Sequence, residues 1–489
     1  MRKRYHVLIG MFVVLFCSCN NWLDVRPRNE MKEDDLYALE DGFKSALNGV
    51  YIQLADVTLY GKTTTLYLPE LLDGHYDVKG YRTWVESYVS SFDYENADVE
   101  NIIASMWKNY YQSIGHVNTI LKNMEENPVH FTNGNDSLVE GECLGLRAFL
   151  HFDLLRYFSG IPEKMSLADK VIPYARKVSK NASDFKCLTY GEVIGYLMED
   201  LDKAERLLEG DPICTLSNKI LNAPGTAGGP EDDWQCYRQI RFNYYAVLAT
   251  KARIYMWLND LEQARKYARM VVDAKNEDGS LKFPLATESW MTSSEGNLVM
   301  TCEHIFGMEN PQHATLMNDM FMYKGNYFRV NQTLANVNTN YESASHPDDI
   351  RNKKDRYWGE KTFFATKKNV FYKYVGNDSY TAINKIPVIR IAEMYLILAE
   401  ALPVAEAKAY WTTYRVARSM NSFVDEEVAN TEKLPGRLER EYQKEFYGEG
   451  QSWFFHKRMN WKQSTWKNGP LFSEKSFCLP LPDDQVNFE

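Results

Sequence analysis

The amino-acid sequence predicts a mainly α-helical protein in which paired helices form a frame and long irregular loops form an outer face. Two observations predict this class. Apolar residues recur three and four positions apart over residues 142–158, 190–208 and 245–272, which is the spacing of one helix face. Stretches at about 56–100, 209–240 and 276–388 show no such spacing. Loops of this length are uncommon unless they carry a function or a structure of their own, so we expect binding residues there.

The first two periodic segments each predict one amphipathic helix. The stripe in 142–158 consists of Leu146, Phe149, Leu150, Asp153, Leu154 and Tyr157. The stripe in 190–208 consists of Val193, Leu197, Leu201, Ala204 and Leu208. Both stripes are expected to face the core.

The third periodic segment, 245–272, predicts two helices joined by a turn at Asn259-Asp260. Ala252 precedes the turn, and Ala264 and Ala268 follow it, at offsets similar to those of a tetratricopeptide repeat. Small alanines at these offsets let two helices pack closely. Further helical pairs are expected at 390–402, 405–420 and 435–459, so the frame is predicted to be tetratricopeptide-like.

The N-terminus has the features of a lipoprotein signal peptide. Arg2, Lys3 and Arg4 precede an apolar run, 7–16, that is too short to span a bilayer. Cys19 follows the small Ser18 and is the expected lipidation site, whereas Cys17 follows the bulky Phe16. We therefore predict a signal peptide at 1–18 and a single domain at 19–489, with an N-terminal part at 19–210. The C-terminal part, 211–489, contains the long loop insertion 276–388.

Charge and cysteine content exclude several classes of protein. The formal net charge is −10, and loss of the three positive charges of the signal makes it −13, which argues against a nucleic-acid partner. Eight cysteines are scattered without metal-ligand spacing, and no phosphate loop or nucleophile elbow occurs. We predict no metal, no cofactor and no catalytic residues. Buried free thiols are favoured, with a Cys214–Cys236 disulfide as the alternative.

The long loops are rich in aromatic residues, which bind the apolar faces of sugar rings while polar neighbours bind the ring edges. The aromatic candidates are Trp84, Tyr81, Tyr76, Trp290 and Tyr327, and the polar candidates are Asp73, Asp77, Arg82 and Asn326. The alternative for each aromatic residue is that it packs its loop onto the frame. Gly74 and Gly80 disfavour a continuous helix around Trp84, so we expect a short helical turn with Trp84 partly exposed.

Several segments, in order, resemble the SusD/RagB family of nutrient-binding outer-membrane lipoproteins. These are "CNNWLDVRP" at 19–27, "GLRAFLHFDLLRYFSGIP" at 145–162, "DDIR" at 348–351, "RIAEMYLILAEAL" at 390–402 and "LPLP" at 479–482. The resemblance implies a SusD-like α-superhelix. It also implies mainly structural roles for Glu393, Tyr395, Glu400, Arg440, Glu449, Trp453 and Arg458.

The resemblance further implies a lipid-anchored protein, exposed at the cell surface, that captures an oligosaccharide without catalysis. It implies delivery of that glycan to a SusC-like TonB-dependent transporter. Relatives that take up peptides make a peptide ligand the first alternative. A glycoside hydrolase needs a pair of carboxylates in a cleft, and although Glu70 and Asp73 are available, nothing in the sequence singles out a pair. A protein-interaction scaffold is the third alternative.

Overall fold

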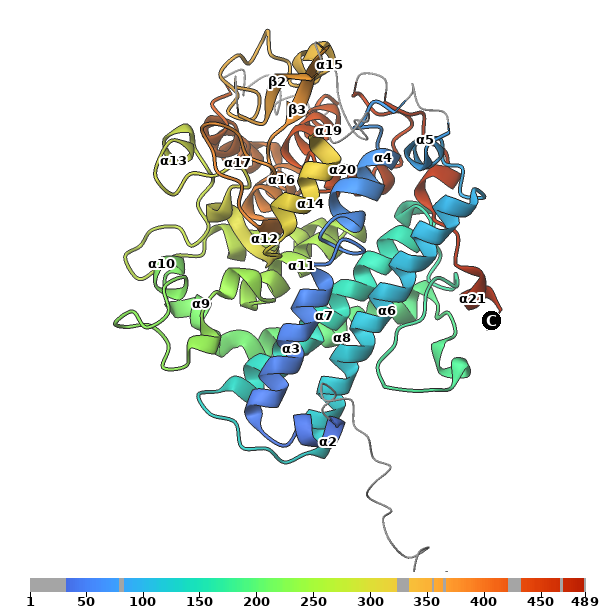
Figure 1. Cartoon of the computed structure of the whole chain (residues 1–489), viewed down its shortest axis with the longest axis vertical. Helices are drawn as coiled ribbons and strands as arrows, with labels where there is room; N and C mark the ends of the chain where they lie inside the picture. The colour runs from blue at the N-terminus through green and yellow to red at the C-terminus, as the bar shows by residue number, and fades with distance from the viewer. Residues whose placement is uncertain are drawn as a thin grey trace, which may run out of the picture.

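The computed structural model describes residues 32–78, 83–322, 334–353, 356–363, 366–420, 432–466 and 469–487. Helices dominate the described ranges, and the strands there form two antiparallel pairs (Figure 1), so the predicted mainly α class is confirmed. The elements are α2 (Glu33–Leu36), α3 (Glu40–Leu54), α4 (Leu68–Leu72), α5 (Val85–Ser90), α6 (Ala97–Glu126), α7 (Asn135–Phe158), α8 (Tyr190–Leu207), α9 (Pro212–Thr215), α10 (Asn218–Leu221), α11 (Tyr244–Trp257), α12 (Leu261–Val272), α13 (Glu288–Met291), β1 (His304–Glu309), α14 (His313–Phe321), α15 (Leu334–Asn340), β2 (Trp358–Phe363), β3 (Thr366–Phe371), β4 (Lys385–Arg390), α16 (Ile391–Ala401), α17 (Val404–Ala417), α19 (Leu434–Glu445), α20 (Gln451–Arg458) and α21 (Asp483–Val486).

Helix α7 is the central helix of the N-terminal half. It packs against α6 and α8, and α3 contacts both α6 and α7 (Figure 1). The predicted apolar stripe is buried, but so is every other residue from 141 to 158, because neighbouring helices cover α7 on more than one side. Gly145 permits one of these approaches, since a Cβ there would lie 2.5 Å from the Phe242 ring.

The predicted tetratricopeptide-like pair is present as α11 and α12. Asn259 adopts φ 58° at the turn, and the Asp260 side chain accepts a hydrogen bond from the backbone N–H of Gln263 at 3.1 Å, which caps α12. Ala252, Ala264 and Ala268 are fully buried at the contact. Helix α16 packs against α11, α12, α17 and α19, so the helical pairs follow one another as a stacked frame.

The segment 276–388, expected to be irregular, contains short elements of its own. Strand β1 pairs with β4, so two parts of the chain that are about 80 residues apart lie side by side. Strands β2 and β3, which lie between them in sequence, pair with each other. Helices α14 and α15 lie between β1 and β2 in sequence. The sequence did not predict these elements because each is at most nine residues long, which is too short for a helical period to be recognised.

Buried arginine–carboxylate pairs connect the stacked helices. Arg253 of α11 makes two hydrogen bonds to Glu393 of α16, at 2.7 and 2.5 Å. Glu445 of α19 binds both Arg390 and Arg418 at 2.7 Å. The structural roles expected from the family motifs are thus visible, since Glu400–Arg458, Glu449–Arg390 and Arg440–Glu342 are ion pairs and Tyr395 and Trp453 are buried.

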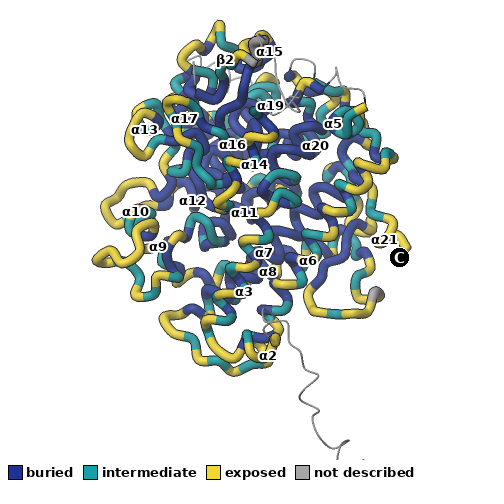
Figure 2. Tube along the Cα trace, viewed as in Figure 1, coloured by how far each residue is buried: buried dark blue, intermediate teal, exposed yellow. Residues whose placement is uncertain are grey.

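One contiguous hydrophobic core runs through these helices, and exposed residues gather on the connecting segments (Figure 2). The six cysteines in the described ranges are free thiols, so the alternative Cys214–Cys236 disulfide is not formed. Cys143, Cys187 and Cys236 are buried, as predicted, and the other three are half-buried. Within the described ranges no helix has both the length and the apolar character needed to cross a bilayer.

Candidate functional site

The segment that follows α4 is fixed to the frame by a histidine–carboxylate network, formed by Glu70, Asp73, His75, Glu439 and His456. His75 lies between Glu70 (Nδ1 to Oε2, 2.7 Å) and Asp73 (Nε2 to Oδ2, 2.9 Å). His456 of α20 lies between Asp73 (2.5 Å) and Glu439 of α19 (2.9 Å). All five side chains are at most 1% exposed, so the network joins α4, α19 and α20 inside the protein.

The carboxylates decide the charge of the two histidines. Burial alone would lower the pKa of His75, but Glu70 and Asp73 outweigh it and raise that pKa to about 10. Burial also opposes the charge of His456, and Asp73 and Glu439 raise its pKa to about 9. The pKa of Asp73 moves in the opposite direction: burial would raise it, whereas the two imidazolium groups hold it well below its usual range. Both histidines are therefore cationic at neutral pH.

An aromatic layer lies beside His75 and contains residues from segments that are far apart in sequence. The ring of His75 stacks on Tyr447 with centroids 5.2 Å apart, and Trp358 and Phe371 meet Tyr447 at 5.0 and 4.8 Å. The layer consists of Tyr76, Phe321, Tyr341, Trp358, Phe371, Tyr447 and Trp466. These rings are buried, so for this set the packing alternative holds.

Two of the predicted ligand contacts therefore lie in the interior. Tyr76 is 4% exposed, and its hydroxyl donates to the carbonyl of Leu66 at 2.6 Å. Asp73 has no exposed surface and is committed to His75 and His456. The expectation of exposed side chains at these positions is corrected, because the apolar α4 packs against α20 and draws the residues after it inward.

Asp77 and Trp84 remain at the surface of this segment. Asp77 is exposed, and Trp84 is half-buried at the position before the first residue of α5. The backbone carbonyl of Trp84 accepts from the N–H of Ser87 at 3.0 Å, which starts this short helix. The expected short helical turn with a partly exposed Trp84 is thus present, and Gly74 adopts φ 73° as the chain leaves α4. Tyr81, Arg82, Asn326, Tyr327 and Cys19 lie outside the described residues.

Trp290 belongs to a separate part of the surface. It lies on α13, which Figure 1 shows on the opposite side of the upper half from α5. Its side chain is half-buried and lines a cleft of about 690 Å³ beside α10. The structure therefore does not bring Trp84 and Trp290 into one site.

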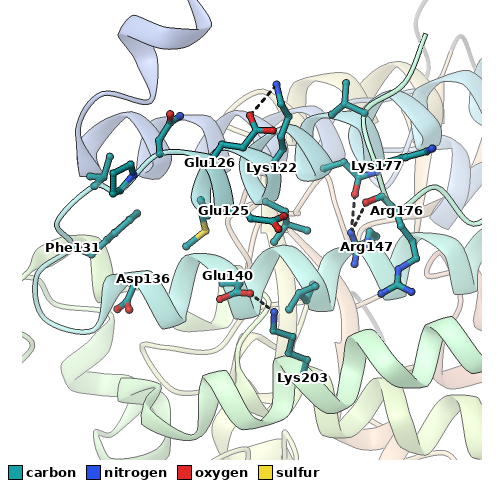
Figure 3. A pocket seen from close by; sticks show the side chains of 18 of the residues that line it. Lys122, Glu125, Glu126, Phe131, Asp136, Glu140, Arg147, Arg176, Lys177 and Lys203 are labelled. Atoms are coloured by element: carbon teal, nitrogen blue, oxygen red, sulfur yellow. Dashed lines mark hydrogen bonds and ion pairs between the residues drawn. The ribbon is translucent and has the colours of Figure 1, made fainter. Parts of the chain in front are cut away.

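A cavity of about 1080 Å³ was not anticipated from the sequence. It opens between α6, α7 and α8, and two of its lysines are paired with glutamates of the same lining (Figure 3). Lys203 binds Glu140 at 2.5 Å, and Lys122 lies 3.6 Å from Glu126. Only the packing of three helices brings these residues together, so no local sequence signal marks the cavity. No group of three or more histidine, cysteine, aspartate or glutamate side chains in the described ranges is arranged to hold a metal ion.

Comparison with known proteins identifies the family. Residues 21–220 match a family model described as "Starch-binding associating with outer membrane", and residues 312–472 match the model of the SusD family. SusD-like protein P38 of Formosa agariphila is 21% identical over 273 residues, which are 54% of this chain and 45% of that protein. The match thus spans less than half of the length of this curated relative.

Solved structures show the same fold. A SusD superfamily protein from Bacteroides thetaiotaomicron superposes with a TM-score of 0.68 at 18% identity, covering 92% of this chain and 98% of the other. A SusD-like carbohydrate binding protein from Bacteroides vulgatus superposes with a TM-score of 0.66 at 15% identity, covering 92% and 96%. Two family models matched in order over well over half of the sequence, together with this fold, show that the chain belongs to the SusD family.

Proposed function

We propose that this protein is a cell-surface lipoprotein, anchored through acylated Cys19, that captures oligosaccharides without catalysis. It delivers them to a SusC-like TonB-dependent outer-membrane transporter. Membership of a family whose model is described as starch-binding and associated with the outer membrane supports this proposal. So does the fold shared with a structure described as a SusD-like carbohydrate binding protein.

The observation that carries the proposal is the partly exposed Trp84 at the start of α5. Trp84 is half-buried and Asp77 is exposed, and the chain just before Asp77 is held by the buried network of His75 and His456. An aromatic side chain has only two rotatable bonds, so it loses little conformational entropy when a sugar ring stacks on its exposed face. The exposed carboxylate of Asp77, in the same segment of the chain, is an acceptor for ring hydroxyls.

The same network favours capture over hydrolysis. Glu70 and Asp73, the acidic pair considered from the sequence, are 1% and 0% exposed. Glu70 accepts from the backbone N–H of Gly450 at 2.8 Å and binds His75, while Asp73 binds both histidines. A glycosidase needs two carboxyl groups on either side of a scissile bond in a cleft, and these two groups face the interior instead.

The test is to screen residues 20–489 against an array of oligosaccharides and a library of short peptides. We expect binding to a subset of the glycans, and a loss of about 5- to 150-fold in affinity for them in Trp84→Ala, in line with roughly 1–3 kcal/mol for one aromatic stack. Tyr237→Asn is the matched control, because it removes an exposed ring from a left-handed backbone position that asparagine tolerates. Binding to peptides but to no glycan would favour the peptide alternative and reject this proposal.

A further inference from the structure

The cleft beside Trp290 has polar groups that are not yet satisfied. We call it the Trp290 cleft; its lining includes Asn218, Asn276, Lys282, Trp290 and Lys385, and its charged lining residues are Lys219, Lys282, Lys385, Asp278 and Glu295. It lies between α10, the turn at 275–281 and α13, on a flank where exposed residues are frequent (Figure 2). Lys275 pairs with Leu281 across the turn, and Gly279 adopts φ 81°, which gives the turn a defined shape.

Lys282 is a buried cation without a carboxylate partner in the described structure. It is 1% exposed, and its ammonium group donates one hydrogen bond, to the carbonyl of Leu216 at 2.8 Å. Burial lowers the pKa of this ammonium group, and the acidic groups in its surroundings do not compensate. An anionic oxygen in the cleft would supply the missing partner.

Two amide oxygens on the same lining lack donors. Asn218 donates from Nδ2 to the carbonyl of Lys282 at 2.9 Å, and Asn276 donates to Ser280 at 2.9 Å. The Oδ1 atoms of both residues are buried and accept no hydrogen bond in the described structure. Buried acceptors without donors are unfavourable. A rotation of either side-chain amide toward the cleft would bring its oxygen within reach of a ligand hydroxyl, which is a donor of the required kind.

Trp290 contributes an aromatic surface to the cleft, and contacts of the neighbouring residues Thr287 and Glu288 hold its helix, α13, in position. Thr287 caps α13 by accepting from the backbone N–H of Trp290 at 3.3 Å. Glu288, at the start of α13, binds Arg356 at 2.5 and 2.6 Å and Lys353 at 2.9 Å. The indole is therefore presented on a short helix that ion pairs fix to the neighbouring segment.

We propose that the Trp290 cleft is a second glycan-binding site, selective for a sugar that carries a carboxylate or sulfate group. The sugar ring stacks on Trp290, its hydroxyls donate to Asn218 and Asn276, and its anionic group binds Lys282, with Lys385 at the rim. This inference rests on the proposed function, since it names a class of glycan. The larger cavity of Figure 3 offers no equivalent, because its lysines near Glu126 and Glu140 are paired.

The test uses residues 20–489 in a Trp84→Ala background, so that the Trp84 face does not contribute. Three tetrasaccharide probes are titrated: tetragalacturonate, a sulfated galactose tetrasaccharide without carboxylates, and neutral maltotetraose. We expect at least one acidic probe to bind tenfold or more tightly than maltotetraose, and the pair of acidic probes distinguishes carboxylate from sulfate. Lys282→Met and Trp290→Ala should each weaken that binding by tenfold or more.

Two controls separate binding from folding. Lys180→Met removes an exposed lysine outside the cleft and should leave the affinity unchanged. Lys282→Met should melt at the same or a higher temperature, since it replaces a buried, unpaired charge with an apolar chain of similar length. Acidic probes that bind no more tightly than maltotetraose, or an affinity that Lys282→Met leaves intact, would overturn the inference. Glycan binding that depends on Trp84 in the native chain would still support the proposed function in that case.

Discussion

The histidine–carboxylate network predicts that the protein loses stability as the pH rises above neutral. His456 and His75 have pKa values raised to about 9 and about 10, above the ordinary value near 6.5. A group whose pKa is raised by folding stabilises the folded state fully below its unfolded pKa, and that contribution is lost as the pH rises through the folded pKa. The loss should therefore occur between about pH 6.5 and pH 10.

The size of the effect follows from the shift of His456. Raising a pKa from 6.5 to about 9 corresponds to about 3 kcal/mol of unfolding free energy. His75 shares Asp73 with His456, so the contributions of the two histidines are coupled and do not simply add. Asp73 acts at the other end of the pH scale: its lowered pKa contributes stability that is present above about pH 4 and lost below it.

The assay is urea unfolding of residues 20–489 at steps from pH 6 to pH 10, for the native chain and for His456→Gln. Glutamine keeps hydrogen-bonding capacity but cannot be cationic, so the variant should lose about 3–5 kcal/mol at pH 6.5 because a buried ion pair is broken. The difference between native chain and variant should shrink by about 3 kcal/mol toward pH 10, while the exposed His130→Gln control follows the native chain. A difference that stays constant over this range would refute the assignment of charge to His456.

Two further predictions concern stability and anchoring. Arg238 is fully buried and binds Asp211 at 2.7 and 2.9 Å and Glu142 at 2.5 Å. Arg238→Met should cost about 3–5 kcal/mol of unfolding free energy, because it leaves the buried Asp211 without a cation and Glu142 with only Arg241 at 3.9 Å. A urea midpoint unchanged from that of the native chain would contradict this prediction. Cys19→Ala should release the protein from the membrane fraction or leave its precursor uncleaved, whereas Cys17→Ala should remain labelled with palmitate; the reverse pattern would move the lipidation site to Cys17.

Segments with a strong helical period could be predicted from sequence. The turn at Asn259 and the buried Ala264 and Ala268 follow from local rules, because a tight turn and small contact residues are properties of neighbouring positions. The "DDIR" motif is also structural: Arg351 makes two hydrogen bonds to Asp349, at 2.9 and 2.7 Å, in the interior. Arg351 also binds Glu445 of α19 at 3.1 Å, so this family motif indicated the fold correctly because it is connected to the frame.

The candidate site was harder to predict because burial depends on partners that are distant in sequence. Tyr76 and Trp358 look like exposed loop aromatics, yet both pack around Tyr447, which lies far along the chain between α19 and α20. Asp73 is inside because His456 provides a charge partner from α20, and nothing near Asp73 in the sequence indicates that contact. The cleft at Lys282 depends on Asn218 in the same way. Trp84 was predictable because its exposure follows from a local break in helix structure.

Capture without hydrolysis at Trp84 is the central claim, and calorimetric titration with analysis of the recovered glycan tests it most directly. Residues 20–489 are titrated with the oligosaccharide that binds most tightly on the array, in parallel with Trp84→Ala, and the sugar is then recovered and its length measured. The account predicts saturable binding, a glycan of unchanged length, and about 5- to 150-fold weaker binding by Trp84→Ala at an unchanged melting temperature. A shortened glycan, or equal affinity in the native chain and Trp84→Ala, would contradict it.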